Sequence, residues 1–220
     1  MEFRIQDLLK YVIPGMLILT VILIGNIISN ITVFPDKVPE SVKDLSAILL
    51  LVFLAVSYTF GYFLDGLASL IEKGLYAWLS KPSFELFNGT NKSYKLNDAE
   101  KIVKFLCNNM NIMVVPALIT KEFAVLLFKT ANVSKDKNPS DVIRERVNEY
   151  YSAYIFSRNL MATLFLSFIY CIILLIFADR SVTLTLYFIL LSFLLMLSLV
   201  RWRMRGYYYS RQVIYASHIV

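Results

Sequence analysis

Residues 182–200 read VTLTLYFILLSFLLMLSLV, and the basic run RWRMR follows directly at 201–205. The apolar run contains no Lys, Arg, Asp, Glu or His, and its length is close to the roughly 20 residues that a helix needs to cross a bilayer. Arginines at the end of such a run are typical of a span that ends in the cytoplasm. This stretch therefore predicts a membrane-spanning helix, and the rest of the chain is interpreted from it.

Three other stretches have the same length and character, at residues 12–31, 46–64 and 160–178. The composition of the whole chain agrees, because 58% of its 220 residues are hydrophobic and only 17% are charged, whereas a soluble domain carries about 25% charged residues. A chain of this size cannot hide so much apolar surface in one core. We therefore predict an all-α integral membrane protein with four transmembrane helices, and we exclude an ordinary soluble enzyme.

The distribution of basic residues predicts which side of the membrane each segment occupies. With a cytoplasmic N-terminus, 19 of the 22 Lys and Arg residues lie on the cytoplasmic side, and only Lys37, Lys43 and Arg180 lie outside. This excess follows the positive-inside rule. Because the chain is also rich in Ile, Lys and Asn, we predict a bacterial inner-membrane protein with both termini in the cytoplasm.

The four predicted spans divide the chain into five parts. The first part has apolar side chains at helical spacing, which indicates an amphipathic helix at the membrane interface, and Pro14-Gly15 then kinks or restarts the helix. The parts are residues 1–13 for the interfacial helix, 14–65 for transmembrane helices 1 and 2, 66–158 for a cytoplasmic helical insertion, 159–200 for the hairpin of transmembrane helices 3 and 4, and 201–220 for a cytoplasmic basic-aromatic tail.

The cytoplasmic insertion is expected to be a small helical bundle built on extensions of two membrane helices. The second transmembrane helix continues beyond Asp65, because its apolar stripe does, and it ends near Lys81-Pro82. The helix before the third span has no breaker, so it continues into the membrane. The expected boundaries are a loop at 84–96, a helix from the capping box Asn97-x-x-Glu100 to Asn109, a helix from Pro116 to Ala131, and a long helix that Ser140 caps.

Few residues are available for metal or nucleotide chemistry. The chain has one histidine, His218, and two cysteines, Cys107 and Cys171, which is too few for the usual His/Cys metal clusters. Its seven glycines do not form the glycine-rich motifs that hold phosphates. We predict no metal and no cofactor. The lack of charge in the four apolar stretches also argues against a proton-coupled carrier or an ion pump.

Charged residues gather where the predicted spans reach the cytoplasm. Asp65 ends the second span, and it is either a solvated carboxylate at a helix end or the partner of Arg158 or Arg201 on a neighbouring helix. Together with Arg203 and Arg205, these residues are the predicted membrane-interface charges.

Small and polar residues within the spans are candidates for helix packing or for a pore. Ser57-x-x-x-Gly61 is a small-xxx-small pair that allows close helix approach, either within the chain or between copies. Asn26 and Thr183 add polar groups to apolar helices. Such groups form local hydrogen bonds, or they line a narrow pore when several copies surround a symmetry axis.

The C-terminal tail alternates basic and aromatic residues from Arg201 to Arg211. One interpretation is RNA binding through phosphate contacts and stacking; the simpler one is a stop-transfer cluster with an aromatic belt. Arg211 and His218 also have the spacing of the Arg-x(4–6)-His motif of HEPN ribonucleases. Chance and packing explain this short match more simply, and catalysis by the pair would require a dimer.

The layout as a whole resembles a known group of proteins. It combines four spans, a helical insertion, an arginine-aromatic tail, Tyr11-x-x-Pro14-Gly15 at the membrane entry and the sequence FGYFLD at 60–65. In these features the chain resembles small four-span bacterial membrane proteins of anti-phage loci, in particular the accessory membrane protein of type VI-B CRISPR systems. The resemblance implies a partner that is an RNA-guided RNA nuclease, and a role in modulating its defence or in forming an oligomeric pore.

Three hypotheses follow for the function. The first is a non-enzymatic membrane effector of anti-phage defence, a homo-oligomer that perturbs membrane permeability or modulates the cytoplasmic nuclease. The second is a membrane scaffold that anchors a cytoplasmic partner and conducts nothing. The third is a membrane-tethered ribonuclease that uses Arg211 and His218. The expected partners are the lipid bilayer, further copies of this chain and the nuclease, with RNA as an additional alternative.

Overall fold

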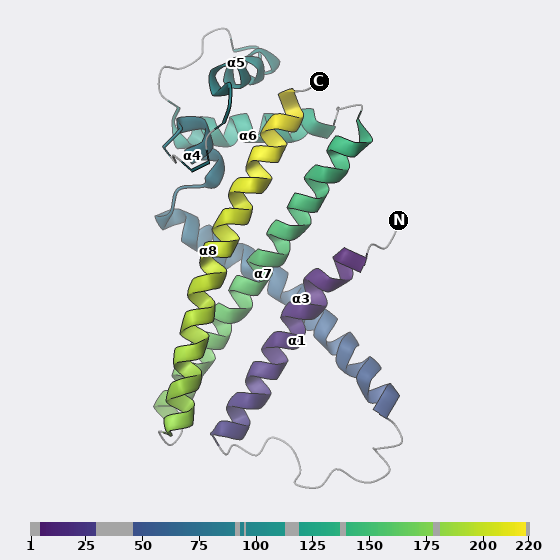
Figure 1. Ribbon diagram of the computed structural model, residues 1–220, viewed down its shortest axis with the longest axis vertical. Helices are drawn as coiled ribbons and strands as arrows, with labels where there is room; N and C mark the ends of the chain where they lie inside the picture. Colours follow the sequence, from purple (N-terminus) through teal and green to yellow (C-terminus); the bar gives the residue numbers. More distant parts are fainter. Residues whose placement is uncertain are drawn as a thin grey trace. The chain divides into compact units, whose positions relative to one another are not determined.

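Every regular element in the described part of the chain is an α-helix. The computed structural model describes residues 5–29, 46–90, 93–94, 96–112, 119–136, 140–177 and 181–218. Its helices are α1 (Ile5–Ile28), α3 (Ser46–Trp78), α4 (Pro82–Asn88), α5 (Ala99–Asn109), α6 (Lys121–Asp136), α7 (Asp141–Phe177) and α8 (Val182–His218), shown in Figure 1. The predicted all-α class is confirmed for these residues, and four of the helices are long and apolar enough to cross a membrane.

The chain forms two compact units. Unit 1 consists of Met1–Glu72 and Ile155–Arg201, and unit 2 consists of Lys73–Tyr154 and Trp202–Val220. Three helices, α3, α7 and α8, contribute residues to both units. The segment predicted as a separate tail is the helical continuation of α8, and its residues belong to unit 2 with the expected insertion.

The relative direction of α1 and α7 in unit 1 follows from the hydrogen bonds between them. Asn159 of α7 donates a hydrogen bond to the Lys10 carbonyl of α1, and Tyr170 of α7 donates one to Asn26 of α1. Residue numbers therefore rise together, and α1 and α7 run in the same direction.

α3 runs against α1 in the same unit. The ring of Tyr11 lies 6.0 Å from that of Tyr62, whereas Gly15, one turn later in α1, lies against Ser57, earlier in α3. Figure 1 shows the two helices crossing obliquely at this point.

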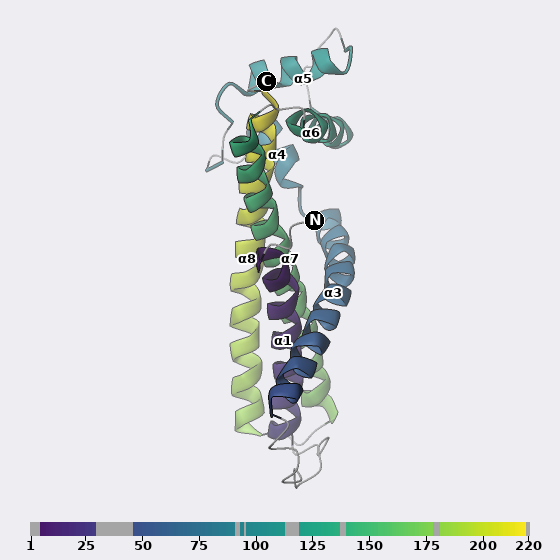
Figure 2. The ribbon, with the colours of Figure 1, turned by 90° about the vertical axis from the view of Figure 1, so that its right-hand side faces the viewer.

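α7 and α8 form an antiparallel hairpin. Figures 1 and 2 both show the two helices side by side, and Phe168 stacks on Phe188 with ring centres 5.1 Å apart. The buried apolar core of unit 1 includes Cys171 of α7 and Leu184 and Leu191 of α8. The continuation of α7 into the third apolar stretch, predicted from the absence of a breaker, is confirmed by its extent from Asp141 to Phe177.

Pro14 lies inside a single helix. Of the two alternatives predicted for Pro14-Gly15, a kink or a restart of the helix, the restart is wrong, because α1 runs unbroken from Ile5 to Ile28. Proline removes the N–H that would bond the carbonyl four residues earlier, which is that of Lys10. The buried Asn159 side chain supplies a substitute donor to this carbonyl at 3.4 Å. The proline is therefore tolerated because a neighbouring helix satisfies the backbone group that it leaves without a partner.

The segment predicted as a loop at 84–96 begins with a helix, and that part of the prediction is wrong. Pro82 occupies the first turn of α4, where its missing N–H costs nothing. Leu86 and Phe87 are buried, so tertiary contacts stabilise this short helix. Gly89 ends it in the left-handed conformation at φ 62°, which glycine adopts without a steric penalty. α3 continues beyond Asp65, as predicted, and it ends at Trp78, before the predicted end near Lys81-Pro82.

The capping box predicted for α5 does not form. Asp98, rather than Asn97, precedes the helix, with φ 56° and no hydrogen bond from its side chain to the helix end. The Asn97 N–H, which the box would bond to Glu100, donates instead to the Tyr215 hydroxyl at 2.9 Å. A long-range partner from α8 has replaced the local one.

α6 begins later than predicted. Ile119 and Thr120 are not helical, and the helix starts at Lys121. Thr120 provides the reason, since its hydroxyl accepts the Phe123 N–H at 3.2 Å as a helix cap does. Pro116, the predicted start, lies outside the described residues.

Unit 2 has a core to which five helices contribute. Its fully buried apolar residues include Leu86 of α4, Ile102 and Leu106 of α5, Leu127 of α6, Val147 of α7 and Val213 and Ile214 of α8. A bundle of helices in residues 66–158 was predicted, and the structure adds the end of α8 to its centre.

Candidate functional site

A buried group of three charges joins α3 to α7 in unit 1. Arg158 approaches the Asp65 carboxylate at 2.6 Å and the Glu72 carboxylate at 3.4 Å. Only 10% of the Arg158 side chain is exposed, against 28% for Asp65 and 12% for Glu72. Of the two partners considered for Asp65, the structure therefore pairs it with Arg158, while Arg201 is exposed.

The geometry of this cluster makes it sensitive to loss of any member. Two carboxylates share one guanidinium, and Arg158 Nε has no hydrogen-bond partner among the described residues. Removing one member of a buried ion pair leaves a charge without compensation, which costs several kcal/mol. The cluster thus fixes the rotation of α3 against α7. Glu72 was missed in the sequence, although its position seven residues after Asp65 places both on one helix face.

The small residues Gly15, Ser57 and Gly61 form the crossing of α1 and α3. A Cβ atom at Gly15 would collide with the Ser57 carbonyl, and one at Gly61 would collide with the Tyr11 carbonyl. The two backbones are therefore in direct contact, as small-xxx-small pairs allow. Ser57 is buried here and donates its hydroxyl to the Phe53 carbonyl at 2.7 Å.

Asn26 serves a contact between α1 and α7. Its side-chain oxygen accepts a hydrogen bond from the Tyr170 hydroxyl at 2.5 Å, and that ring packs over Gly25. Tyr187 of α8 donates to the Val21 carbonyl at 3.2 Å in the same region. Thr183, the fourth predicted pore or packing residue, is exposed on α8.

Two buried hydroxyls of α7, those of Thr163 and Ser167, are satisfied within the helix. Thr163 donates to the Asn159 carbonyl and Ser167 to the Thr163 carbonyl, both at 2.8 Å. Hydroxyls bonded in this way tolerate an apolar environment. Asn159 Oδ1, in contrast, is buried and has no hydrogen-bond partner in the described part of the chain.

In unit 2 the arginine-aromatic segment is largely packed inside the protein. Arg203 contacts the Glu85 carboxylate at 2.6 Å, and the Tyr207 hydroxyl donates to the same carboxylate. Burial by itself lowers the pKa of the Arg203 guanidinium, but Tyr207 and Glu85 outweigh it and raise the pKa above its ordinary value. Tyr94 stacks on Tyr207 with ring centres 4.7 Å apart.

This packing limits what the segment offers to RNA. Trp202 and Tyr207 are 1% and 2% exposed, so their ring faces are not accessible for base stacking. Arg205 is half-buried, and only Arg201 of the predicted interface arginines is exposed. Glu85 was missed because it was assigned to a loop, and no sequence signal linked it to Arg203.

Arg211 and His218 are both in the helical backbone of α8, but the side chain of His218 lies outside the described part of the structure. The Arg211 guanidinium lies over the Tyr215 ring, 5.3 Å from its centre, and its Nε is buried without a hydrogen-bond partner among the described residues. A ribonuclease role for the pair remains a prediction.

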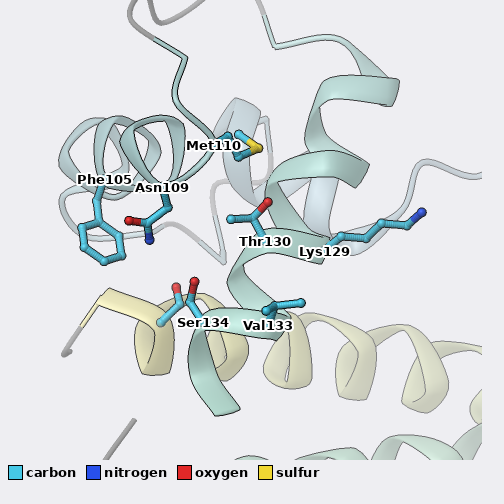
Figure 3. Close-up of a pocket in the computed structure, with 8 residues that line it drawn as sticks. Phe105, Asn109, Met110, Lys129, Thr130, Val133 and Ser134 are labelled. Atoms are coloured by element: carbon cyan, nitrogen blue, oxygen red, sulfur yellow. The ribbon is translucent and has the colours of Figure 1, made fainter. Parts of the chain in front are cut away.

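A cavity of about 580 Å³ lies in unit 2 and is drawn in Figure 3. α5 contributes Phe105 and Asn109, Met110 follows it directly, α6 contributes Lys129, Thr130, Val133 and Ser134, and α8 contributes Ser217. The lining includes no His, Cys, Asp or Glu, and the Lys129 ammonium in Figure 3 points away from the other labelled side chains. The cavity therefore presents hydroxyls and an amide rather than an acid–base pair.

Among the described residues, no group of three or more His, Cys, Asp or Glu side chains is placed to hold a metal ion. Comparison of the chain with family models, curated proteins and solved structures gave no match. The molecule is thus defined by its own geometry as an all-helical protein, in its described part, with four helices long and apolar enough to cross a membrane.

Proposed function

We propose that the chain is a four-span integral membrane protein of the bacterial inner membrane. The most apolar 18-residue windows of its four long helices are only 17 to 39% buried within the protein. Contiguous exposed apolar surface of this extent requires lipid or another protein. The helix directions agree with four successive crossings, since α1 and α7 run one way and α3 and α8 run the other.

The charge of the two units supports a cytoplasmic position for unit 2. Its sequence holds 15 basic and 8 acidic residues, a net charge of +7, whereas unit 1 holds 7 basic and 8 acidic residues. Basic segments remain on the cytoplasmic side of bacterial membranes. Both termini then lie in the cytoplasm.

The proposed role is that of an accessory protein of anti-phage defence that modulates a cytoplasmic RNA-guided RNA nuclease. The layout and short motifs that resemble the type VI-B accessory proteins suggest the partner. The observation that carries the mode of action is the continuity of α3, α7 and α8 through both units. A partner bound to unit 2 would contact helices that continue directly into the membrane.

The geometry favours this accessory role over an oligomeric pore. Asn26, Ser57 and Gly61 make contacts within one chain, so three of the four polar or small candidates are not free to line a channel. A conducting oligomer remains the competing effector mode, and a passive scaffold is the second alternative. The ribonuclease alternative rests on the spacing of Arg211 and His218 in the sequence alone.

The membrane topology is tested with single added cysteines in the full chain. Val142, on α7 in unit 2, is 69% exposed, so Val142→Cys should react with a membrane-impermeant maleimide in inside-out vesicles and not in intact spheroplasts. Lys37→Cys should show the opposite pattern. Labelling of both sites from the same side would overturn the four-span assignment.

The accessory role is tested in cells that express an RNA-guided RNA nuclease with and without this chain. We expect the membrane fraction to retain the nuclease, and its interference against a target RNA to change, without loss of the membrane potential measured with a voltage-sensitive dye. Loss of potential on expression of the chain alone would favour the pore. If the membrane fraction retains the nuclease but its interference against the target RNA is unchanged, the accessory role is overturned in favour of the passive scaffold.

A further inference from the structure

An aromatic residue protrudes where α3 ends in unit 2. Trp78 is the last residue of α3 and is 92% exposed, the largest exposed fraction among the exposed large hydrophobic residues of the described chain. Leu79 follows it and is 39% exposed. An indole that makes so few contacts within its own protein is suited to the headgroup level of a bilayer, where its apolar ring and its N–H are both satisfied.

In the same unit, Leu79, the residue that follows Trp78 in the chain, lines a hollow of about 170 Å³. Leu79 and Phe84 contribute apolar side chains to its lining, which also includes two basic residues, Lys81 and Lys121, and one acidic residue, Glu122. Both lysines are exposed. The hollow therefore combines apolar surface with a net positive charge.

We propose that Trp78, Leu79, Lys81, Phe84 and Lys121, here called the Trp78 site, bind an anionic phospholipid of the cytoplasmic leaflet. The lysines pair with the headgroup phosphate, while Leu79 and Phe84 contact the first methylenes of the lipid. The net charge of +7 on unit 2 complements the negative surface potential of that leaflet. This inference rests on the proposed membrane insertion and adds a specific lipid site to it.

The length of α3 is consistent with a Trp78 position at the headgroups. Its 33 residues span about 50 Å at 1.5 Å per residue, whereas the hydrocarbon core is about 30 Å thick. A helix whose apolar stretch is longer than the hydrocarbon core is accommodated in a bilayer by tilting. Leu67 and Leu70, between Asp65 and Trp78, are exposed as well, as expected of a helix that stays near lipid.

The test uses Trp78 as its own reporter, because the chain has only two tryptophans and the other, Trp202, is buried. The full-length Trp202→Phe protein is reconstituted into vesicles that contain brominated phosphatidylglycerol or brominated phosphatidylcholine in equal amounts. We expect bromine near the glycerol end to quench Trp78 more than bromine near the chain terminus. We also expect phosphatidylglycerol to be enriched at Trp78 about fivefold over phosphatidylcholine, the effect of roughly one lysine at such a surface.

Charge-matched variants separate the site from the general charge of unit 2. Lys81→Gln with Lys121→Gln should abolish the preference for phosphatidylglycerol, whereas Lys101→Gln with Lys104→Gln, which removes the same charge from exposed residues of α5, should retain it. If Trp202→Phe does not fold, the difference between the wild-type and Trp78→Phe emission spectra reports the same quenching.

The outcomes distinguish this site from the membrane assignment itself. Absence of Trp78 quenching in a chain that resists alkaline extraction from membranes would overturn the site and leave the proposed topology intact. Equal quenching by the two lipids, or equal effects of the two lysine pairs, would overturn its anionic specificity. Extraction of the chain by alkali would overturn membrane insertion, and the lipid site with it.

Discussion

The hydrogen bond from Asn159 to the Lys10 carbonyl explains why α1 tolerates a proline at position 14. Pro14 leaves that carbonyl without its helical donor, and the fully buried Asn159 amide provides a replacement from α7. In an apolar environment an unsatisfied carbonyl is expensive, so the two residues should depend on each other.

We predict coupling between Asn159→Leu and Pro14→Ala. Asn159→Leu should destabilise the otherwise wild-type protein by about 1–2 kcal/mol. The same change should cost less in the Pro14→Ala variant, because an alanine at this position has an N–H that bonds the Lys10 carbonyl directly. Denaturant unfolding in detergent of the two single variants, the double variant and the wild type measures the coupling. Strictly additive effects would contradict the proposed role of Asn159.

The two cysteines are packing residues in this structure. Cys107 of α5 and Cys171 of α7 are free thiols with no exposed surface. Burial raises the pKa of the Cys107 thiol, which lowers the fraction of reactive thiolate at neutral pH.

We therefore predict that neither cysteine reacts with a maleimide at pH 7 in the folded protein, and that both react after unfolding in dodecyl sulfate. Mass spectrometry of the labelled protein counts the modified thiols. Rapid modification of Cys107 in the native state would show that the core of unit 2 opens more readily than its burial implies.

At the scale of helices, close backbone contact decides where α1 and α3 cross. The surroundings of the helical glycines differ sharply: Gly15 and Gly61 face backbone atoms of the partner helix, while Gly66 and Gly74 have open space where an alanine methyl group would lie. Glycine is otherwise unfavourable in a helix by about 1 kcal/mol relative to alanine. A glycine-to-alanine substitution should therefore lower the stability of the protein at Gly15 and Gly61 but not at Gly66 and Gly74.

We predict that Gly15→Ala and Gly61→Ala each lower stability by about 1–3 kcal/mol or more, because the helices must separate. Gly66→Ala and Gly74→Ala, on the same helix α3 as Gly61, should be neutral or raise stability by up to about 1 kcal/mol. Thermal unfolding in detergent compares the four variants. A loss of stability at Gly66 equal to that at Gly61 would refute the crossing.

At the scale of the whole molecule, the ion pair of Asp65 and Arg158 joins two residues that lie 93 positions apart in the chain. This pair and Glu72 connect α3 with α7, two helices that contribute to both units. The cluster is mostly buried, so its charges are less screened than those of a surface pair.

We predict that Arg158→Gln lowers the free energy of unfolding by about 3 kcal/mol, since Asp65 and Glu72 both lose their ion pair with the buried guanidinium. Arg144→Gln is the matched control: Arg144 pairs with the exposed Asp141, and its loss should change stability by less than about 1 kcal/mol. Denaturant unfolding measures both. Simultaneous replacement of Arg158, Asp65 and Glu72 by apolar residues should recover much of the loss, and no recovery would contradict the electrostatic explanation.

The sequence by itself determined the helices and their apolar character. Hydropathy and breakers act over a few neighbouring residues, so the start of α8 at Val182 coincides with the predicted start of the fourth span. The continuation of α3 beyond Asp65 followed from the same local pattern. The helix cap predicted at Asn97-x-x-Glu100 did not form, because the Asn97 N–H donates to the Tyr215 hydroxyl of α8 instead.

Only the tertiary structure decided what each candidate residue contacts. Whether Asp65 faced water, Arg158 or Arg201 depended on the rotation and crossing of whole helices, and Asn159 acquired a role only when α7 came to lie beside Pro14. The same is true of Trp202 and Tyr207, which the sequence placed in a membrane-interface tail and which are buried residues of unit 2. The periodicity of the sequence predicts which residues share a helix face, but only the packing of the helices determines which neighbouring residues that face contacts.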